Sequence, residues 1–196
     1  MTTGFWTENL TAASKDPKRN FRFRVSFTGG SKMTVDSNGA SSADGVWYAK
    51  KVTQPKVTIT ESKHDFMMHK FYWPAKAEWN EIDLTLVDPV TPHVSRNLLL
   101  AAQNAGFKIP GSVQSGFNSM SKSAAVLQMG TLLIEQLDAD GTSLSSWSLK
   151  HAWAREIGFS DFDYGNEDLM EVTMKIRYDW AEFNTSQPNP LKIFGV

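Results

Sequence analysis

The pattern of apolar and polar residues along the chain is mainly that of β-strands. It is clearest at residues 172–180, where five apolar residues in strict alternation are expected to share one face of a strand: Val172, Met174, Ile176, Tyr178 and Trp180. A second strand is expected over residues 146–153. Residues 158–168 are rich in Gly, Asp, Asn and Ser, which favours a turn. The stretch 149–180 is therefore predicted to form two strands joined by an acidic, aromatic connection.

Further strands are expected earlier in the chain. The first, at residues 19–27, has one aromatic and one cationic face. Strands are also expected at 46–52, from residue 57 onward and at 79–87, and residues 66–73 are expected to extend a long hairpin. A long apolar strand is expected at 125–137. Asp138 to Gly141 has the composition of a hairpin turn, because Asp-Gly supplies the positive φ that such turns need.

One helix is expected, at residues 93–105. Thr91 is a suitable N-cap, Pro92 suits the first helical position, and Gly106 follows the last apolar residue. About seven strands with short links and one helix predict a mainly β fold, in which two antiparallel sheets pack as a small barrel or sandwich with the helix on one side.

Composition narrows the functional classes. The chain has 196 residues, 41% of them hydrophobic, a net charge of −1 and no cysteine. The charge argues against general attraction to nucleic acid, and the missing cysteine excludes disulfides and thiol chemistry. No apolar run is long enough to span a membrane and the first residues lack a signal-peptide pattern, so a soluble intracellular chain is expected. The 12% aromatic content fits either a β-rich core or extensive interfaces.

Charge is distributed unevenly. Residues 15–78 hold twelve Lys or Arg against six Asp or Glu, whereas residues 156–196 hold three against eight. Ordinary surface patchiness accounts for this asymmetry. So does a head-to-tail contact, in which the basic part of one copy meets the acidic part of the next.

The sequence shows no catalytic, cofactor or metal motif. It contains no Gly-x-Ser-x-Gly, no phosphate-binding loop and no dinucleotide fingerprint. His64 and His69 are five residues apart, which on one extended strand places them on opposite faces. The acidic turn lacks the spacing of a calcium loop, so a solvated turn or a protein contact is the simpler interpretation. We expect neither an enzyme nor a cofactor.

Basic and aromatic residues alternate closely over residues 69–76. The pattern suits a platform for single-stranded nucleic acid and also an exposed hairpin that packs on another protein. The near-zero net charge and the need of an exposed aromatic strand for a partner favour the protein contact.

Two stretches together resemble the tail tube proteins of contractile-tailed bacteriophages. The first runs from Trp47 to Pro55 and from His69 to Pro89, and includes Trp-x-x-Ile-x-Leu-x-Leu. The second runs from Trp147 to Trp153 and through Phe162-Asp-Tyr164 to a strand that ends Tyr-x-Trp. The family includes the haemolysin-coregulated tube proteins of type VI secretion. The resemblance implies the two-sheet fold with its flanking helix, in a single domain 1–196 with insertion-like loops near 29–45 and 106–123 and a tail at 183–196.

The resemblance also implies an assembly. Six copies would form a ring, and stacked rings would form the inner tube of a contractile tail, a channel for genomic DNA. The partners would be the tail sheath protein and the baseplate and tail-terminator proteins, and the location the virion, after assembly in the host cytoplasm. Contacts between subunits are expected at Lys63, Phe66, Lys70, Phe71, Tyr72 and Trp73 on the hairpin, and at Asp161, Asp163 and Asp168 in the acidic turn. Residues 172–180 would belong to the barrel wall.

Three alternatives remain open at this point. The chain could form a tube-initiating or adaptor ring at the baseplate, or the tube of a related injection particle. From another functional class, a β-barrel module that binds a ligand in an aromatic cavity also suits the composition.

Overall fold

The computed structural model describes residues 17–29, 49–90, 93–107, 119–165 and 167–185. In these ranges the chain forms ten strands and two helices, in agreement with the mainly β prediction. In chain order they are β1 (Phe23–Gly29), β2 (Ala49–Val52), β3 (Val57–Phe66), β4 (His69–Trp79), β5 (Ile82–Val87), α1 (Val94–Asn104), α3 (Lys122–Met129), β6 (Gly130–Leu137), β7 (Ser143–Lys150), β8 (Trp153–Phe159), β9 (Glu171–Arg177) and β10 (Trp180–Thr185).

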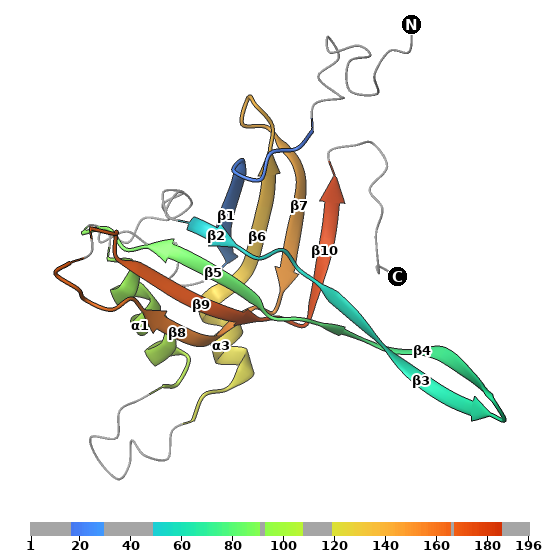
Figure 1. Cartoon of the computed structure of the whole chain (residues 1–196). Helices are drawn as coiled ribbons and strands as arrows, with labels where there is room; N and C mark the ends of the chain where they lie inside the picture. The colour runs from blue at the N-terminus through green and yellow to red at the C-terminus, as the bar shows by residue number, and fades with distance from the viewer. Residues whose placement is uncertain (1–16, 30–48, 91–92, 108–118, 166, 186–196) are drawn as a thin grey trace, which may run out of the picture.

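The strands form two four-stranded antiparallel sheets that cross one another, together with a separate hairpin (Figure 1). One sheet has the order β1-β6-β7-β10 and the other has the order β2-β5-β9-β8. The hairpin pairs β3 with β4 alone. The two packed sheets confirm the predicted sandwich, although the described strands do not close into a barrel. The expected long hairpin is also present, as a two-stranded sheet of its own.

The alternating strands produce the core as the sequence predicts. Leu84 of β5 is paired with Met174 of β9, and Ile82 is paired with Ile176, so the apolar faces of both strands coincide. All four side chains are at most 1% exposed. Burial of a side chain of this size stabilises the fold by about 1.5–3 kcal/mol relative to exposure, so this strand pair is a major source of stability.

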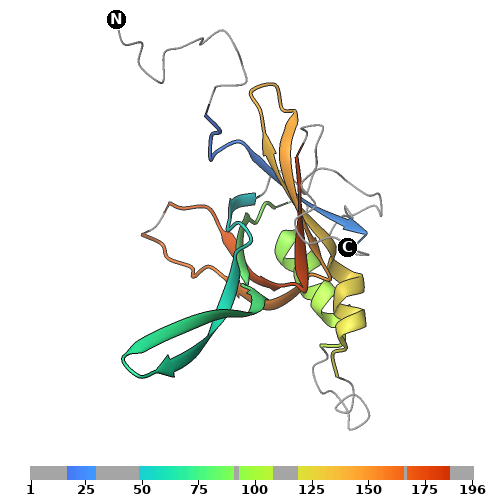
Figure 2. The same cartoon turned by 90° about the vertical axis from the view of Figure 1, so that its right-hand side faces the viewer.

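Two helices cover one open side of the sandwich. Helix α1 packs on α3, and α3 contacts β8 of one sheet and both β1 and β6 of the other. Figure 2 shows the two helices side by side at the lower end of the sheet that contains β6 and β7. The helix predicted at 93–105 is confirmed as α1. Its expected cap, Thr91-Pro92, lies outside the described residues, and the Asp88 carboxylate accepts hydrogen bonds from the backbone N–H groups of Val94 and Ser95.

The prediction of one long strand at 125–137 is wrong in its first part. Residues 122–129 form α3, and the strand begins at Gly130. Ser121 caps the helix, since its hydroxyl accepts a hydrogen bond from the Ala124 N–H, and Gly130 ends it with a φ of 73°. An unbroken apolar run does not distinguish a strand from a buried helix.

Several strand boundaries also differ from the prediction. Residues 19–22 precede β1, and the expected strand 79–87 is divided into the end of β4 and the whole of β5. The expected strand 146–153 is also divided, because His151 has a φ of 54° and turns the chain between β7 and β8. The Asp138–Gly141 turn is confirmed: it links β6 to β7, and Gly141 has a φ of 78°.

Trp180 does not belong to the strand in which it was expected. Strand β9 ends at Arg177, and Trp180 begins β10 in the other sheet, where it is paired with Lys150 and 41% exposed. The change of sheet occurs at Asp179, whose N–H donates to the carbonyl of Lys150. This corner interrupts the alternation, so only four of the five apolar residues point into the core.

The corner is held by polar side chains from α3, from the turn between β7 and β8 and from the link between β9 and β10. Lys122 of α3 donates to both carboxylate oxygens of Asp179 at 2.6 and 2.7 Å, and His151 Nδ1 lies 2.9 Å from Oδ2. The hydrogen bond from Lys122 is the main reason why the pKa of Asp179 is lowered, and the contact with His151 adds to it. The Asp179 carboxylate therefore links α3 to the places where both sheets turn.

Candidate assembly surfaces

The β3–β4 hairpin extends well beyond the body of the molecule (Figures 1 and 2). Apart from Val57 and Trp79 at its base, every residue of its two strands is exposed. The hairpin turns at Met67 and Met68, which are 89% and 96% exposed. An isolated two-stranded hairpin is marginally stable in water, and an exposed apolar patch of this kind marks an interaction site.

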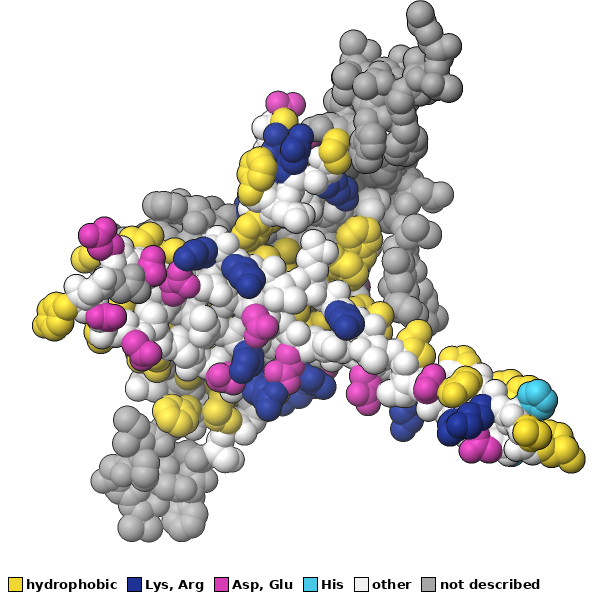
Figure 3. Space-filling view, in the orientation of Figure 1, with side chains coloured by type: hydrophobic (Ala, Val, Ile, Leu, Met, Phe, Trp, Pro, Cys, Tyr) yellow, Lys and Arg dark blue, Asp and Glu magenta, His cyan; other side chains and the backbone are white. Residues whose placement is uncertain are grey.

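The register gives the hairpin two different faces. One face carries Phe66, Phe71 and Trp73, because His69, His64 and Ser62 are their cross-strand partners. The other face carries Lys63 opposite Tyr72, and Asp65 opposite Lys70. Of the six hairpin residues predicted to make subunit contacts, three aromatic residues thus share one face, and Lys63, Lys70 and Tyr72 share the other. Figure 3 shows hydrophobic side chains along the arm to its tip.

The expectation that His64 and His69 point to opposite faces is wrong. The argument assumed one continuous strand, but the turn at residues 67–68 lies between them. His64 is paired with Phe71, two residues from His69 on the same strand, so both histidines are on the aromatic face. Within the described ranges, no group of three or more His, Asp or Glu side chains could hold a metal ion.

The second predicted surface is the segment 160–170, here called the acidic loop. It is closed at its base, since the Ser160 N–H donates to the Glu171 carbonyl and the Glu171 N–H donates to the Ser160 hydroxyl. Asp161, Asp163 and Asp168 are all exposed on it, as a contact surface requires. Asp163 also accepts a hydrogen bond from the Gly165 N–H at 2.9 Å, which shapes the turn.

Sequence reasoning about contacts missed the exposed apolar residues of the acidic loop and of the hairpin tip. Phe162 is 90% exposed and Tyr164 is fully exposed, and Leu169 is also exposed. Aromatic residues inside a run of Asp, Gly and Asn were the available signal, because such a short turn has no core in which to bury them. Met67 and Met68 had no comparable signal, since their exposure depends on where the turn lies.

The remaining predicted residues lie on β9 and just after it, apart from Trp180, which begins β10. Val172, Met174, Ile176 and Tyr178 are buried, and the side chains between them face outward. Lys175 donates to Glu156 of β8 at 2.9 Å, which is the main cause of the lowered pKa of Glu156. Arg177 lies 3.5 Å from Glu81, to which Arg155 also donates. In Figure 3 charges of both signs are interspersed on the body of the molecule.

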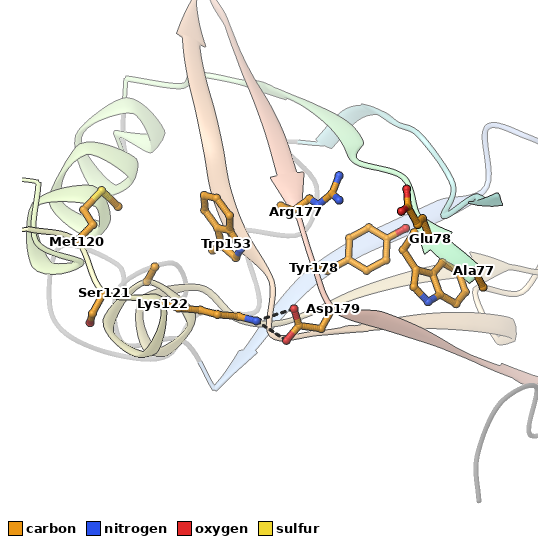
Figure 4. Close-up of a pocket in the computed structure, with 11 residues that line it drawn as sticks. Ala77, Glu78, Met120, Ser121, Lys122, Trp153, Arg177, Tyr178 and Asp179 are labelled. Carbon is orange, nitrogen blue, oxygen red and sulfur yellow. Dashed lines mark hydrogen bonds and ion pairs between the residues drawn. The ribbon is translucent and has the colours of Figure 1, made fainter. Parts of the chain in front are cut away.

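A pocket of about 660 Å³ opens between the hairpin base, the start of α3 and the end of β9 (Figure 4). Trp79, Trp153 and Tyr178 line it, and the Lys122–Asp179 ion pair lies at one side. Burial raises the pKa of Tyr178 to about 12, an increase that the nearby backbone of Lys56 partly opposes. The Trp79 and Tyr178 rings lie with their centroids 6.0 Å apart. The end of β4 therefore packs on the body of the molecule at the base from which the hairpin projects.

The fold can be compared with known structures now that its surfaces are described. No protein-family model matches the sequence, and no curated protein matches it. Among solved structures, a chain of the 6-fold symmetrised anti-feeding prophage baseplate has a TM-score of 0.60 at 13% identity, over 88% of this chain and 98% of that chain. A chain of the extended sheath–tube complex of PVC, an extracellular contractile injection system, has a TM-score of 0.61 at 14% identity, over 88% and 95%.

A third similar chain comes from the anti-feeding prophage cap, described as a tube-terminating cap. It has a TM-score of 0.59 at 15% identity, over 87% of this chain and 93% of that chain. The protein therefore has the fold of components of contractile injection systems. This confirms, at the level of the fold, the resemblance to contractile tail tube proteins. No helix in the described part of the chain combines the length and apolarity needed to cross a membrane.

Proposed function

We propose that this protein is a structural subunit of the inner tube of a contractile tail. Copies assemble into hexameric rings, and the rings stack into a tube that the contracting sheath drives forward. The observation that carries the proposal is the β3–β4 hairpin, which projects an aromatic face into solvent from a fold similar to those of contractile-particle components. Its role is mechanical and requires no catalysis.

The hairpin supports assembly because the described part of the chain leaves its aromatic face largely exposed. Phe66, Phe71 and Trp73 are between 48% and 60% exposed on one face. Large aromatic side chains supply much of the contact energy at protein interfaces. We propose that this face packs on a neighbouring subunit, with Lys63, Lys70 and Tyr72 at the margin of the contact.

The sheet edges support the same proposal. In the described part of the chain, β1 and β10 are the outer strands of one main sheet, and β2 and β8 are the outer strands of the other. Edge strands present backbone N–H and C=O groups that can pair with another chain. We propose that edges of adjacent subunits pair within a ring, so that strands 171–177 of six copies become part of one continuous inner wall. The outward side chains of β9 would then face the lumen or a neighbour.

The channel is proposed to conduct genomic DNA, with the sheath, baseplate and tail-terminator proteins as partners, in a virion assembled in the host cytoplasm. A net charge of −1 suits a conduit that binds its cargo weakly. DNA should therefore bind weakly and without sequence preference. Two related roles would use the same surfaces. The tube of an injection particle would carry another cargo, and a tube-initiating ring would occupy another position, at the baseplate.

The test is the mass of the purified chain in solution as a function of concentration. A hexamer of 21.9 kDa subunits has a mass of about 131 kDa. Light scattering coupled to gel filtration should give this mass or larger multiples at low salt. A monomer at every concentration up to the solubility limit, with a small molecule retained by the chain, would instead support the ligand-binding module.

A further inference from the structure

A cleft of about 990 Å³ opens between the two main sheets, away from the helices. Its floor is apolar and comes from both sheets: Phe23, Val52, Ile134, Trp147 and Phe183. The rings of Trp147 and Phe183 pack together with their centroids 4.7 Å apart. Ile134 belongs to the buried core, whereas the other four side chains are only partly buried. The cleft is thus a hydrophobic recess that needs an apolar occupant.

The rim of the cleft is basic. Lys18, Lys50 and Lys51 line it, against the single carboxylate of Glu135. Arg24 donates to that carboxylate at 2.6 Å, and this hydrogen bond raises the pKa of Arg24. The carboxylate of the lining is therefore already paired. Of the three lysines, Lys50 pairs with Glu171. Lys18 and Lys51 keep the rim basic and suited to an acidic partner.

The acidic loop has the complementary chemistry. Residues 160–170 contain four carboxylates and no Lys or Arg. Phe162 and Tyr164 extend into solvent from the loop, each next to an Asp. The hydrogen bonds between Ser160 and Glu171 close the base of the loop. The loop therefore presents aromatic side chains inside a ring of negative charge, and the cleft presents an aromatic floor inside a ring of positive charge.

The loop of the same copy does not fill this recess. Lys50 pairs with Glu171 and is influenced by the charge of Asp168, so the loop starts near the rim. Its aromatic side chains nevertheless stay exposed, at 90% for Phe162 and fully for Tyr164. Among the described residues no segment fills the cleft, and the occupant that we consider is the acidic loop of a second copy.

We propose that the acidic loop of one copy inserts Phe162 and Tyr164 into the lysine-rimmed cleft of a second copy, and that this contact stacks one ring on the next. This inference rests on the proposed tube function and adds the pair of surfaces that joins the rings. We assign the contact as head-to-tail, from the loop of one copy to the cleft of the next, because this arrangement repeats along one direction, whereas a reciprocal exchange between two copies would stop at a dimer. That property is what a stacked tube requires.

Charge reversal tests the pairing of the two surfaces. One variant carries Asp161→Lys and Asp163→Lys, and the other carries Lys18→Glu and Lys51→Glu. Each variant alone should form rings but need at least a tenfold higher concentration to stack. In an equimolar mixture, each loop finds a cleft of opposite charge on the other variant, so stacking should recover as alternating rings. Equal stacking by all samples at low salt, or no recovery in the mixture, would overturn the proposal.

Cross-linking tests the contact directly, because the natural chain contains no cysteine. Gly165→Cys places a thiol on the loop, where an added Cβ meets only the Asp163 carboxylate at an ordinary 3.5 Å. Gln54→Cys places a thiol on the cleft. Since each chain carries one thiol, a short bis-maleimide can join them only between two copies. Arg96→Cys on the exposed side of α1 is the matched control for the cleft thiol.

The expected result is a mixed dimer of the Gly165→Cys and Gln54→Cys chains, identified by mass, with little product from the control pair. Tubes that form without this mixed dimer would overturn the loop-and-cleft contact and leave the proposed function intact. A wild-type chain that forms no rings would overturn the proposed function, and with it this inference.

Discussion

Substitution of Trp73 by alanine separates assembly from folding. Trp73 lies on the aromatic face of the hairpin and is 60% exposed. A Trp side chain has a surface of roughly 250 Å², and 60% of that of Trp73 is exposed, so a subunit contact can remove about 150 Å² from water. At about 25 cal/mol per Å² this is worth up to about 4 kcal/mol, and about half of that if the contact covers half of the ring.

The Trp73→Ala variant should therefore need at least tenfold more protein to assemble, since 1.4 kcal/mol is about a factor of ten. The unfolding free energy of the monomer should change by only about 0.5 kcal/mol, because the side chain has few contacts within its own chain. Sedimentation velocity measures the assembly threshold, and urea unfolding below that threshold measures monomer stability.

Ile176→Ala is the matched control for this experiment. Ile176 of β9 is fully buried opposite Ile82 of β5, so its truncation should destabilise the monomer by about 2–5 kcal/mol. The two variants should thus fail in different assays. An equal loss of monomer stability and assembly in Trp73→Ala, or an unchanged assembly threshold, would refute the assignment of the hairpin as an interface.

Three further predictions concern the fold. Gly106→Ala should destabilise the protein by about 2–4 kcal/mol in thermal unfolding, because φ is +115° and an added Cβ would lie 2.7 Å from the Ser119 carbonyl oxygen. Gly141→Ala is the control: its Cβ would meet open space, so it should cost only about 1 kcal/mol. Equal costs for the two variants would contradict this reasoning. The pKa of Asp179 is lowered in the folded chain, so wild type should be about 1 kcal/mol more stable than Asp179→Asn at neutral pH and should lose this advantage as the pH falls below 3.8. Urea unfolding of both proteins over this pH range measures it. A stability difference that does not change with pH would contradict the prediction. The pKa of Tyr178 is raised in the folded chain, so its neutral hydroxyl should contribute fully to stability below pH 10.0, and this contribution should decline towards about pH 12. In unfolding experiments at alkaline pH, Tyr178→Phe should lack that decline.

The parts of the fold that the sequence predicted are those where one local pattern decides the structure. The alternation in 172–178 fixes which face of β9 is buried, and Asp-Gly fixes the turn before β7. Helix α3 was missed because its apolar residues continue into β6 without a change of polarity. The signals for its limits, Ser121 before it and Gly130 after it, were present in the sequence but concern single residues.

The candidate surfaces were predicted only in part, for a different reason. Alternation in the hairpin identifies aromatic residues that share a face, but it does not state whether that face is covered. Trp73 and Ile176 have the same local pattern, and only the tertiary structure shows that one strand projects from the body and the other lies in the sandwich. The basic cleft is formed by residues as distant in sequence as Lys18 and Phe183, so no local pattern indicates it.

The central claim is that this chain builds a tube, and negative-stain electron microscopy of the purified wild-type protein tests it most directly. The account predicts six-fold rings with an open central channel, which stack into tubes of uniform diameter as concentration rises. Particles of monomer size at high concentration, without rings or filaments, would contradict it.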